Sequence, residues 1–180
     1  MKKLIEKYFL PSEYVNRFSD ITLEMLKDKN KKAVMIDLDN TMVAFDDPNA
    51  NDEVLDWIKK LEENGIEVLI LSNGNRNRVE KFAVPHDLKF IHSARKPLMK
   101  NFHLGLRMLN VTKKEVVMVG DQLMTDVLGA NRVRMDSILV LPIKDKDGYA
   151  TLLNRRLERI VMKWMDNKDL INWRGNSDNV

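Results

Sequence analysis

Two carboxylates one residue apart, Asp37 and Asp39, directly follow an apolar run over residues 33–36. Burying an anion is costly unless a cation or hydrogen-bond donors accompany it, so this pair makes a poor piece of core. The same pair is able to hold a divalent cation through its oxygens, or to exchange protons with a substrate. Alone, the acidic pair is weak evidence for metal binding or for proton exchange, because a solvated loop or a helix N-cap uses the same residue types.

Polar residues also follow three further apolar runs, just beyond the point where each predicted strand would end. They are Ser72 and Asn73 after residues 67–71, Lys96 after residues 89–91, and Asp121 and Asp126 after residues 116–119. In an open parallel sheet, ligands bind outside the carboxyl ends of the strands. We therefore expect these side chains to meet at one edge of a sheet, and their joint occurrence is far less expected by chance than the acidic pair.

The elements that would position these residues alternate along the chain. Apolar runs predict strands at residues 33–36, 67–71, 89–91, 116–119 and 137–141, and amphipathic spacing predicts helices at 53–64, 76–82, 97–109 and about 124–131. Strands without polar alternation are buried on both faces. We therefore expect an α/β fold of three layers, with a central, mostly parallel sheet of five strands flanked by helices.

The composition favours a single domain. The chain has 180 residues, of which 44% are hydrophobic, enough for one well-packed core. We place the catalytic core at about 33–141, a helical extension in two pieces around Pro11 at 1–32, and an amphipathic helix at about 150–174. The absence of cysteine excludes disulfides and thiolate chemistry. The 30 basic and 27 acidic residues look interspersed, so no nucleic-acid partner is expected.

No apolar run approaches the roughly 18 residues that a membrane-spanning helix needs. The N-terminal segment is interrupted by Glu6, Lys7 and Pro11, which is not typical of a signal peptide. We therefore expect a cytoplasmic protein. The segment 152–171 combines an apolar helical face with basic residues, a pattern typical either of a helix packed on the sheet or of one lying on an anionic membrane. The pattern alone favours the packed helix.

The types and order of the polar residues resemble the motifs of haloacid dehalogenase-like (HAD) phosphatases. The matching positions are Asp37, Asp39 and Thr41 in DxDxT, then Ser72, then Lys96, and finally Asp121 and Asp126 in GDxxxxD. The resemblance covers about residues 33–141. It implies a Rossmann-like domain and a Mg²⁺-dependent phosphatase that acts through an aspartyl-phosphate.

By this resemblance, Asp37 is the nucleophile, and Asp39 is the general acid that later acts as a base. Mg²⁺ would be held by Asp37, by the backbone carbonyl of Asp39 and by Asp121. Asp126 would hold either Lys96 or a metal-bound water.

The resemblance also implies residues that bind the phosphoryl group. Thr41 and Ser72 would donate hydrogen bonds, and Lys96, in preference to Lys100, would supply a positive charge. For Ser72 the alternative is a helix N-cap. Asn73 is either a turn residue or a substrate contact. Three arginines near the predicted edge are either solvated or hold a second phosphate of the substrate; they are Arg76, Arg78 and Arg95.

The substrate is suggested by two features. Neither the segment 41–72 nor the segment 72–96 has room for a cap domain, and an open site suits a large or embedded substrate. Longer phrases, among them YFLPSEYV, DLDNTMVAFDDPNA, SARKPLMKNF and VGDQLMTDVLGANR, resemble the HAD subfamily IIIA group known as the YqeG family. Its eukaryotic relatives are phosphatidylglycerophosphate phosphatases. The resemblance thus implies an anionic phospholipid substrate, and a peripheral enzyme on the inner face of the membrane.

Two other functions stay open at this point. One is a phosphatase for a soluble sugar, nucleotide or other metabolite phosphate. The other is a HAD-fold interaction module without turnover, which the intact motif positions disfavour. The oligomeric state is not indicated by the sequence.

Overall fold

Six parallel strands form one sheet in the order β1-β6-β5-β2-β3-β4. This computed structural model describes residues 2–47, 51–144 and 160–165. The strands are β1 (Glu13–Tyr14), β2 (Ala33–Ile36), β3 (Glu67–Leu71), β4 (Lys89–Ile91), β5 (Val116–Gly120) and β6 (Asp136–Leu139). The predicted α/β fold with a parallel sheet is confirmed, and strands 33–36, 67–71 and 89–91 have the predicted bounds.

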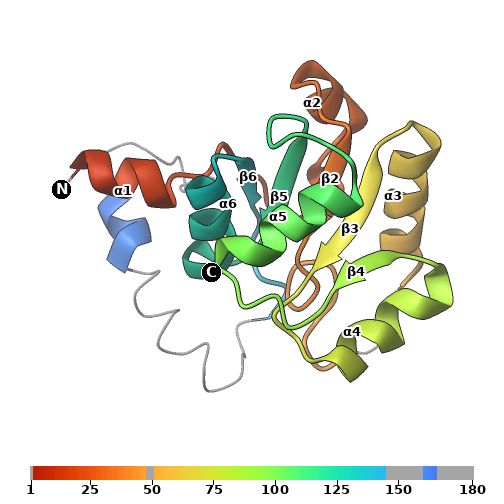
Figure 1. Cartoon of the computed structure of the whole chain (residues 1–180). Helices are drawn as coiled ribbons and strands as arrows, with labels where there is room; N and C mark the ends of the chain where they lie inside the picture. Colours follow the sequence, from red (N-terminus) through yellow and green to blue (C-terminus); the bar gives the residue numbers. More distant parts are fainter. Residues whose placement is uncertain (1, 48–50, 145–159, 166–180) are drawn as a thin grey trace, which may run out of the picture.

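Six α-helices in the described part of residues 2–133 connect and cover these strands (Figure 1). They are α1 (Lys2–Phe9), α2 (Leu23–Asp28), α3 (Asp52–Glu63), α4 (Arg76–Ala83), α5 (Met99–Met108) and α6 (Leu128–Val133). The described residues also contain two 3₁₀ turns, η1 (Phe18–Asp20) and η2 (Val84–His86), one π-helical turn, η3 (Leu123–Val127), and a helical segment at 160–165. The helix predicted at about 124–131 therefore begins as a π turn.

Alternation of side chains along the strands divides the core into two layers. In β2, Val34 and Ile36 pack with α3, α4 and the N-terminal elements on one face of the sheet. Ala33 and Met35 point to the other face, where α5 and α6 cover them. The sheet is therefore buried on both sides, which leaves its edges as the places for polar side chains.

Local sequence determines where α3 begins and ends. The side chain of Asn51 accepts a hydrogen bond from the Val54 N–H at 3.0 Å, so it caps the helix N-terminus. Gly65 follows the helix with a φ of 75°, a left-handed conformation that glycine adopts without steric cost. The predicted position of Gly65 at the end of this helix is confirmed.

The N-terminal extension contains the predicted helices, but it also adds a sixth strand. Strand β1 pairs with β6, and the Ser12 N–H donates to the Ser137 carbonyl at 2.9 Å. A strand of two residues has too little sequence to show a periodic pattern, so the prediction of five strands was one short.

Residues 160–165 are helical and lie beside α1 (Figure 1). Met165 is fully buried, and Val161 and Trp164 pack in the same cluster as Ile5 of α1. Ile160 of the predicted apolar face is exposed instead. In this part of the chain the helix is packed on the protein; the rest of the predicted helix at 150–174 lies outside the described residues. No helix in the described ranges is long and apolar enough to cross a membrane.

Candidate active site

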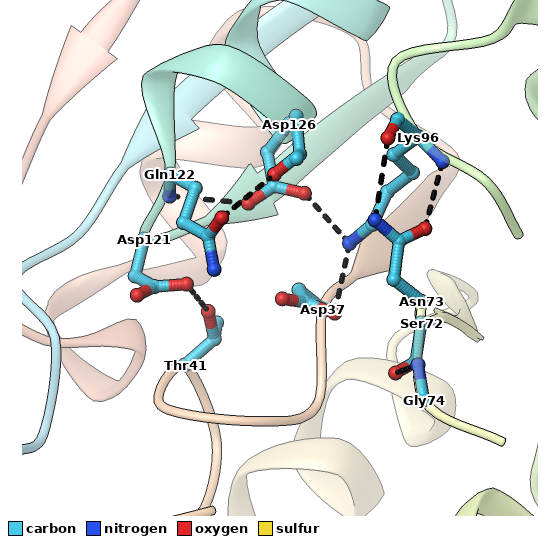
Figure 2. A network of polar contacts seen from close by, with 10 residues as sticks. Asp37, Thr41, Ser72, Asn73, Gly74, Lys96, Asp121, Gln122 and Asp126 are labelled. Atoms are coloured by element: carbon cyan, nitrogen blue, oxygen red, sulfur yellow. Dashed lines mark hydrogen bonds and ion pairs between the residues drawn. The ribbon is translucent and has the colours of Figure 1, made fainter. Parts of the chain in front are cut away.

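The predicted site residues meet at the carboxyl edge of the sheet (Figure 2). Asp37 directly follows β2, and its N–H continues the ladder by donating to the Val119 carbonyl of β5 at 2.9 Å. Asp121 follows β5 itself, and Ser72 follows β3. Three neighbouring strands thus deliver side chains to one place, as the motif spacing predicted.

Lys96 lies between two carboxylates. Its side chain is 1% exposed, and its Nζ is 2.8 Å from Asp37 Oδ1 and 2.6 Å from Asp126 Oδ1. An ammonium group has three N–H donors, so two carboxylate contacts leave one N–H able to take another acceptor. Burial alone would lower the pKa of Lys96, but the charges of Asp126 and Asp37 outweigh it and raise the pKa to about 12. Lys100, by contrast, is exposed.

Asp126 is turned toward Lys96 by the π-helical turn η3. The Gln122 N–H donates to Asp126 Oδ2 at 3.1 Å, which leaves Oδ1 facing the lysine. Burial raises the pKa of Asp126 to about 7, although Lys96 opposes that shift. A Cβ at Gly120 would lie 2.3 Å from Asp126 Cγ, so only glycine leaves room for the carboxylate. A π turn of this kind is frequent at functional sites.

Three buried carboxylates could hold a metal ion. Asp37, Asp121 and Asp126 each present an oxygen, and these atoms lie within 4.8 Å of one another. The Thr41 hydroxyl donates to Asp121 Oδ1 at 3.2 Å, and the oxygen of Asp37 not held by Lys96 points to this side (Figure 2). Three carboxylates beside one ammonium group leave an excess of negative charge. A hard divalent cation with oxygen ligands fits this donor set.

Asp39 has a different environment from the other carboxylates. Its Oδ1 accepts from Arg78 Nε at 2.9 Å, and Arg78 Nη2 donates to the Asp47 carbonyl at 2.9 Å. Burial raises the pKa of Asp39, Arg78 lowers it and the charge of Asp37 raises it further. The Asp39 carboxylate is not part of the acidic cluster. Coordination of the metal by the backbone carbonyl of Asp39 therefore stays a prediction.

The turn after Asp39 explains the asparagine in DLDNT. Asn40 has a φ of 63°, in the left-handed region where asparagine is several-fold enriched among non-glycine residues. Its N–H donates to the Val43 carbonyl at 2.7 Å, and its own carbonyl accepts from the Ile143 N–H at 3.0 Å. The tight turn keeps Thr41 within reach of Asp121.

Ser72 and Asn73 follow β3 and have separate partners. The Ser72 hydroxyl accepts from the Gly74 N–H at 2.9 Å, which leaves its hydrogen able to donate to a phosphoryl oxygen. It is not a helix N-cap, because Asn75 caps α4. The Asn73 amide accepts from the Lys96 N–H at 2.7 Å and donates to the Lys96 carbonyl at 3.2 Å. Asn73 therefore positions Lys96, and a contact with substrate stays a prediction.

The sequence left undecided whether Arg78 is solvated or lies in the site. The Asn75 cap places Arg78 in the first turn of α4, where side chains lean toward the helix N-terminus and thus toward the site. Once the start of α4 was known, a sequence argument could have separated it from Arg95, which lies on a loop, but not from Arg76, which lies in the same first turn. What it could not show is that the loop after β2 passes within reach.

Comparison with known proteins agrees with this geometry. The family of haloacid dehalogenase-like hydrolases matches residues 9–134. The chain belongs to this family. It is 42% identical over 170 residues to a Bacillus subtilis protein named "Probable phosphatase YqeG", a match that covers 94% of this chain and 99% of that protein. The predicted membership of the HAD superfamily, and the prediction that the protein is a phosphatase, are confirmed.

More distant similarities concern part of the chain or the fold. Ribulose-1,5-bisphosphate 5-phosphatase of Halopiger xanaduensis is 27% identical over 111 residues, which cover 57% of this chain and 46% of that protein. The cobalt-bound deoxy-D-mannose-octulosonate 8-phosphate phosphatase of Haemophilus influenzae has a TM-score of 0.53 at 14% identity, covering 80% of this chain and 94% of that one. An uncharacterised Listeria monocytogenes protein has a TM-score of 0.52 at 18% identity, covering 73% and 99%. These two structures show the shared fold.

Proposed function

We propose that this protein removes the terminal phosphate of phosphatidylglycerophosphate to give phosphatidylglycerol, with Mg²⁺ as cofactor and Asp37 as nucleophile. The observation that carries the reaction is the Lys96 ammonium group between Asp37 and Asp126, with Asp121 in the same acidic cluster. A phosphoryl group brought to Asp37 would meet a buried cation there, as an anionic transition state requires.

In the first step, an oxygen of Asp37 bonds to phosphorus while the bond from phosphorus to the ester oxygen breaks. Asp39 gives its proton to that oxygen, which leaves as a hydroxyl group of the product lipid. Burial raises the pKa of Asp39, which favours the protonated form that this step needs. Lys96 and the hydroxyl groups of Thr41 and Ser72 attract the phosphoryl oxygens.

In the second step, water attacks the phosphorus of the aspartyl-phosphate. Asp39, now a carboxylate, takes a proton from this water, and the bond between phosphorus and Asp37 breaks to release inorganic phosphate. Mg²⁺ held by Asp37, the Asp39 carbonyl, Asp121 and, directly or through water, Asp126 would cancel the repulsion between nucleophile and substrate. The two steps together return Asp37 and Asp39 to their starting protonation.

A lipid substrate is supported by the resemblance to the YqeG group and by the surface around the site. Between Thr41 and Ser72 the described residues contain one helix, α3, and no cap domain. Four large apolar side chains, between 39% and 56% exposed, lie on loops after β2, β4 and β6 or at the start of α5; they are Phe45, Leu98, Met99 and Ile143. An open site with an apolar margin suits a substrate in a bilayer, reached from the cytoplasmic face.

A soluble bisphosphate is the second candidate substrate. The Halopiger relative is named for a sugar bisphosphate, and Arg78 places a positive charge beside Asp39. A small polar substrate would not need the apolar margin, so activity on lipid and on soluble esters separates the two candidates.

The experiment is phosphate release from phosphatidylglycerophosphate in mixed micelles, beside a panel of soluble sugar phosphates, with and without Mg²⁺. We expect Mg²⁺-dependent turnover of the lipid, and a loss of at least about 1,000-fold in kcat for Asp37→Asn, with a cooperative thermal unfolding transition that shows the variant to be folded. Turnover of a soluble ester with the lipid untouched would refute the lipid substrate and keep the reaction class. Full activity of Asp37→Asn would refute the mechanism.

A further inference from the structure

Three arginines lie near the catalytic edge, but their environments differ. Arg76 is 72% exposed and pairs with Glu80 one helical turn away, at 2.7 Å. Arg95 is exposed on the loop before Lys96. Arg78 is 15% exposed, and its guanidinium group contacts the Asp39 carboxylate at 2.9 Å. Of the three, Arg78 is the one that reaches the site.

Arg78 and Lys96 serve different parts of a bound substrate. Lys96 contacts Asp37 and Asp126, so its charge lies where the transferred phosphoryl group would be held. Arg78 instead contacts Asp39, the residue proposed to protonate the leaving oxygen. A group in contact with that proton donor is close to the leaving group, and a charge there affects only substrates whose leaving group is itself charged.

The guanidinium group of Arg78 is not fully satisfied. Nε and Nη2 donate to Asp39 and to the Asp47 carbonyl, while Nη1 is buried and has no hydrogen-bond partner in the described part of the chain. A buried donor without an acceptor destabilises the protein, so such a group calls for a reason. An acceptor supplied by the substrate would remove this cost in the complex.

We infer that Arg78 binds a second anionic group, of phosphate or phosphodiester type, carried by the leaving group of the substrate. This inference rests on the proposed function and makes it more specific, because it names the residue that selects the substrate. Because Nε and Nη2 are held by Asp39 and Asp47, the N–H groups of Nη1 are left for an oxyanion, an arrangement that the single ammonium group of a lysine does not reproduce. A membrane lipid and a soluble bisphosphate both supply this chemistry.

The test compares three esters at constant ionic strength. Glycerol 3-phosphate has a neutral leaving group, glycerol 1,3-bisphosphate adds one phosphate to it, and a water-soluble short-chain phosphatidylglycerophosphate carries a phosphodiester. We expect Arg78→Gln to lower kcat/KM for the two esters with an anionic leaving group by about 10- to 100-fold more than for glycerol 3-phosphate. Arg78→Lys should recover only part of that selectivity, and Arg76→Gln, on the same helix, should leave all three values unchanged.

The ratio of kcat/KM values decides the question. An equal loss on all three esters in Arg78→Gln would mean that Arg78 only positions Asp39, and would overturn the inference while leaving the proposed reaction intact. If the wild type hydrolyses none of the three, the proposed function fails together with the inference. A loss of activity in Arg78→Gln that is selective for the bisphosphate and the lipid supports the inference. Of these two esters, the one with the higher wild-type kcat/KM identifies the source of the anion.

Discussion

Two buried lysines lie at opposite edges of the same sheet, and they differ in their partners. Lys31 precedes β2 at the amino edge; its Nζ donates to the Lys114 carbonyl at 2.7 Å and to Asp136 at 2.6 Å. The side chain of Asp136 is 48% exposed. Lys96, at the carboxyl edge, contacts two carboxylates that are both buried.

The difference shows that burial of a charged side chain does not by itself indicate a functional site. At the amino edge one lysine meets one carboxylate that water also solvates, so the local charges balance. At the carboxyl edge one lysine stands among three buried carboxylates, so negative charge is in excess. An uncompensated buried charge is costly to keep, which indicates that the carboxyl edge is completed by a cation and a ligand.

Removing each lysine in turn tests this comparison, and of its tests we expect this one to show the largest effect. Lys96→Met should lower kcat/KM by about 100- to 1,000-fold, because the phosphoryl oxygens lose a preorganised cation. Lys31→Met should leave kcat/KM within about twofold and cost only about 1 kcal/mol of stability, because water can solvate Asp136. Steady-state kinetics and thermal unfolding of both variants provide the measurement. Equal losses of activity would show that the two edges do not differ as described.

Two glycines provide a second comparison between the site and the core. A Cβ at Gly120 would meet the Asp126 side chain at 2.3 Å, so Gly120→Ala must displace the carboxylate from Lys96. A misplacement of about 1 Å near a catalytic site costs up to about 100-fold in rate, and we expect a loss of about 10- to 100-fold.

Gly105→Ala is the matched control. Its Cβ would meet the flexible end of Met35 at 2.7 Å, and the gain in helix propensity offsets the crowding, so stability should change by less than about 1 kcal/mol. Activity of this variant should stay at the wild-type level. A fully active Gly120→Ala enzyme would mean that the contact between Asp126 and Lys96 is dispensable.

How far the sequence could predict this site depends on whether strand order or the packing of a particular side chain creates each contact. Asp37, Ser72 and Asp121 were predictable because strand order brings the ends of buried strands to one edge, whatever the details of packing. The contact of Arg78 with Asp39 joins residues 39 positions apart and depends on how α4 packs against a loop. The role of Asn73 on the Lys96 backbone is of the same kind. Such contacts leave no periodic pattern in the sequence, and neither does the two-residue strand β1.

The smallest expected effect concerns protons and Mg²⁺ at the carboxyl edge. The pKa of Asp126 is raised to about 7, so between about pH 4 and pH 7 the folded state binds a proton that the unfolded state has released. Stability of the metal-free protein should therefore fall as the pH rises through this window. Mg²⁺ must displace that proton, so it should stabilise the protein more at about pH 8 than at about pH 5.

Thermal unfolding with and without Mg²⁺ at the two pH values measures this linkage. Mg²⁺ at about 100 times its Kd stabilises the folded protein by about 2.7 kcal/mol. For a chain of this size, that raises the melting temperature by about 5 to 10 °C at the higher pH. Asp136→Asn, at the amino edge, should leave the Mg²⁺ response unchanged, whereas Asp121→Asn should abolish it. An equal response at both pH values would separate the Asp126 proton from metal binding, and would leave Asp37 and Asp121 as the side chains that hold the cation.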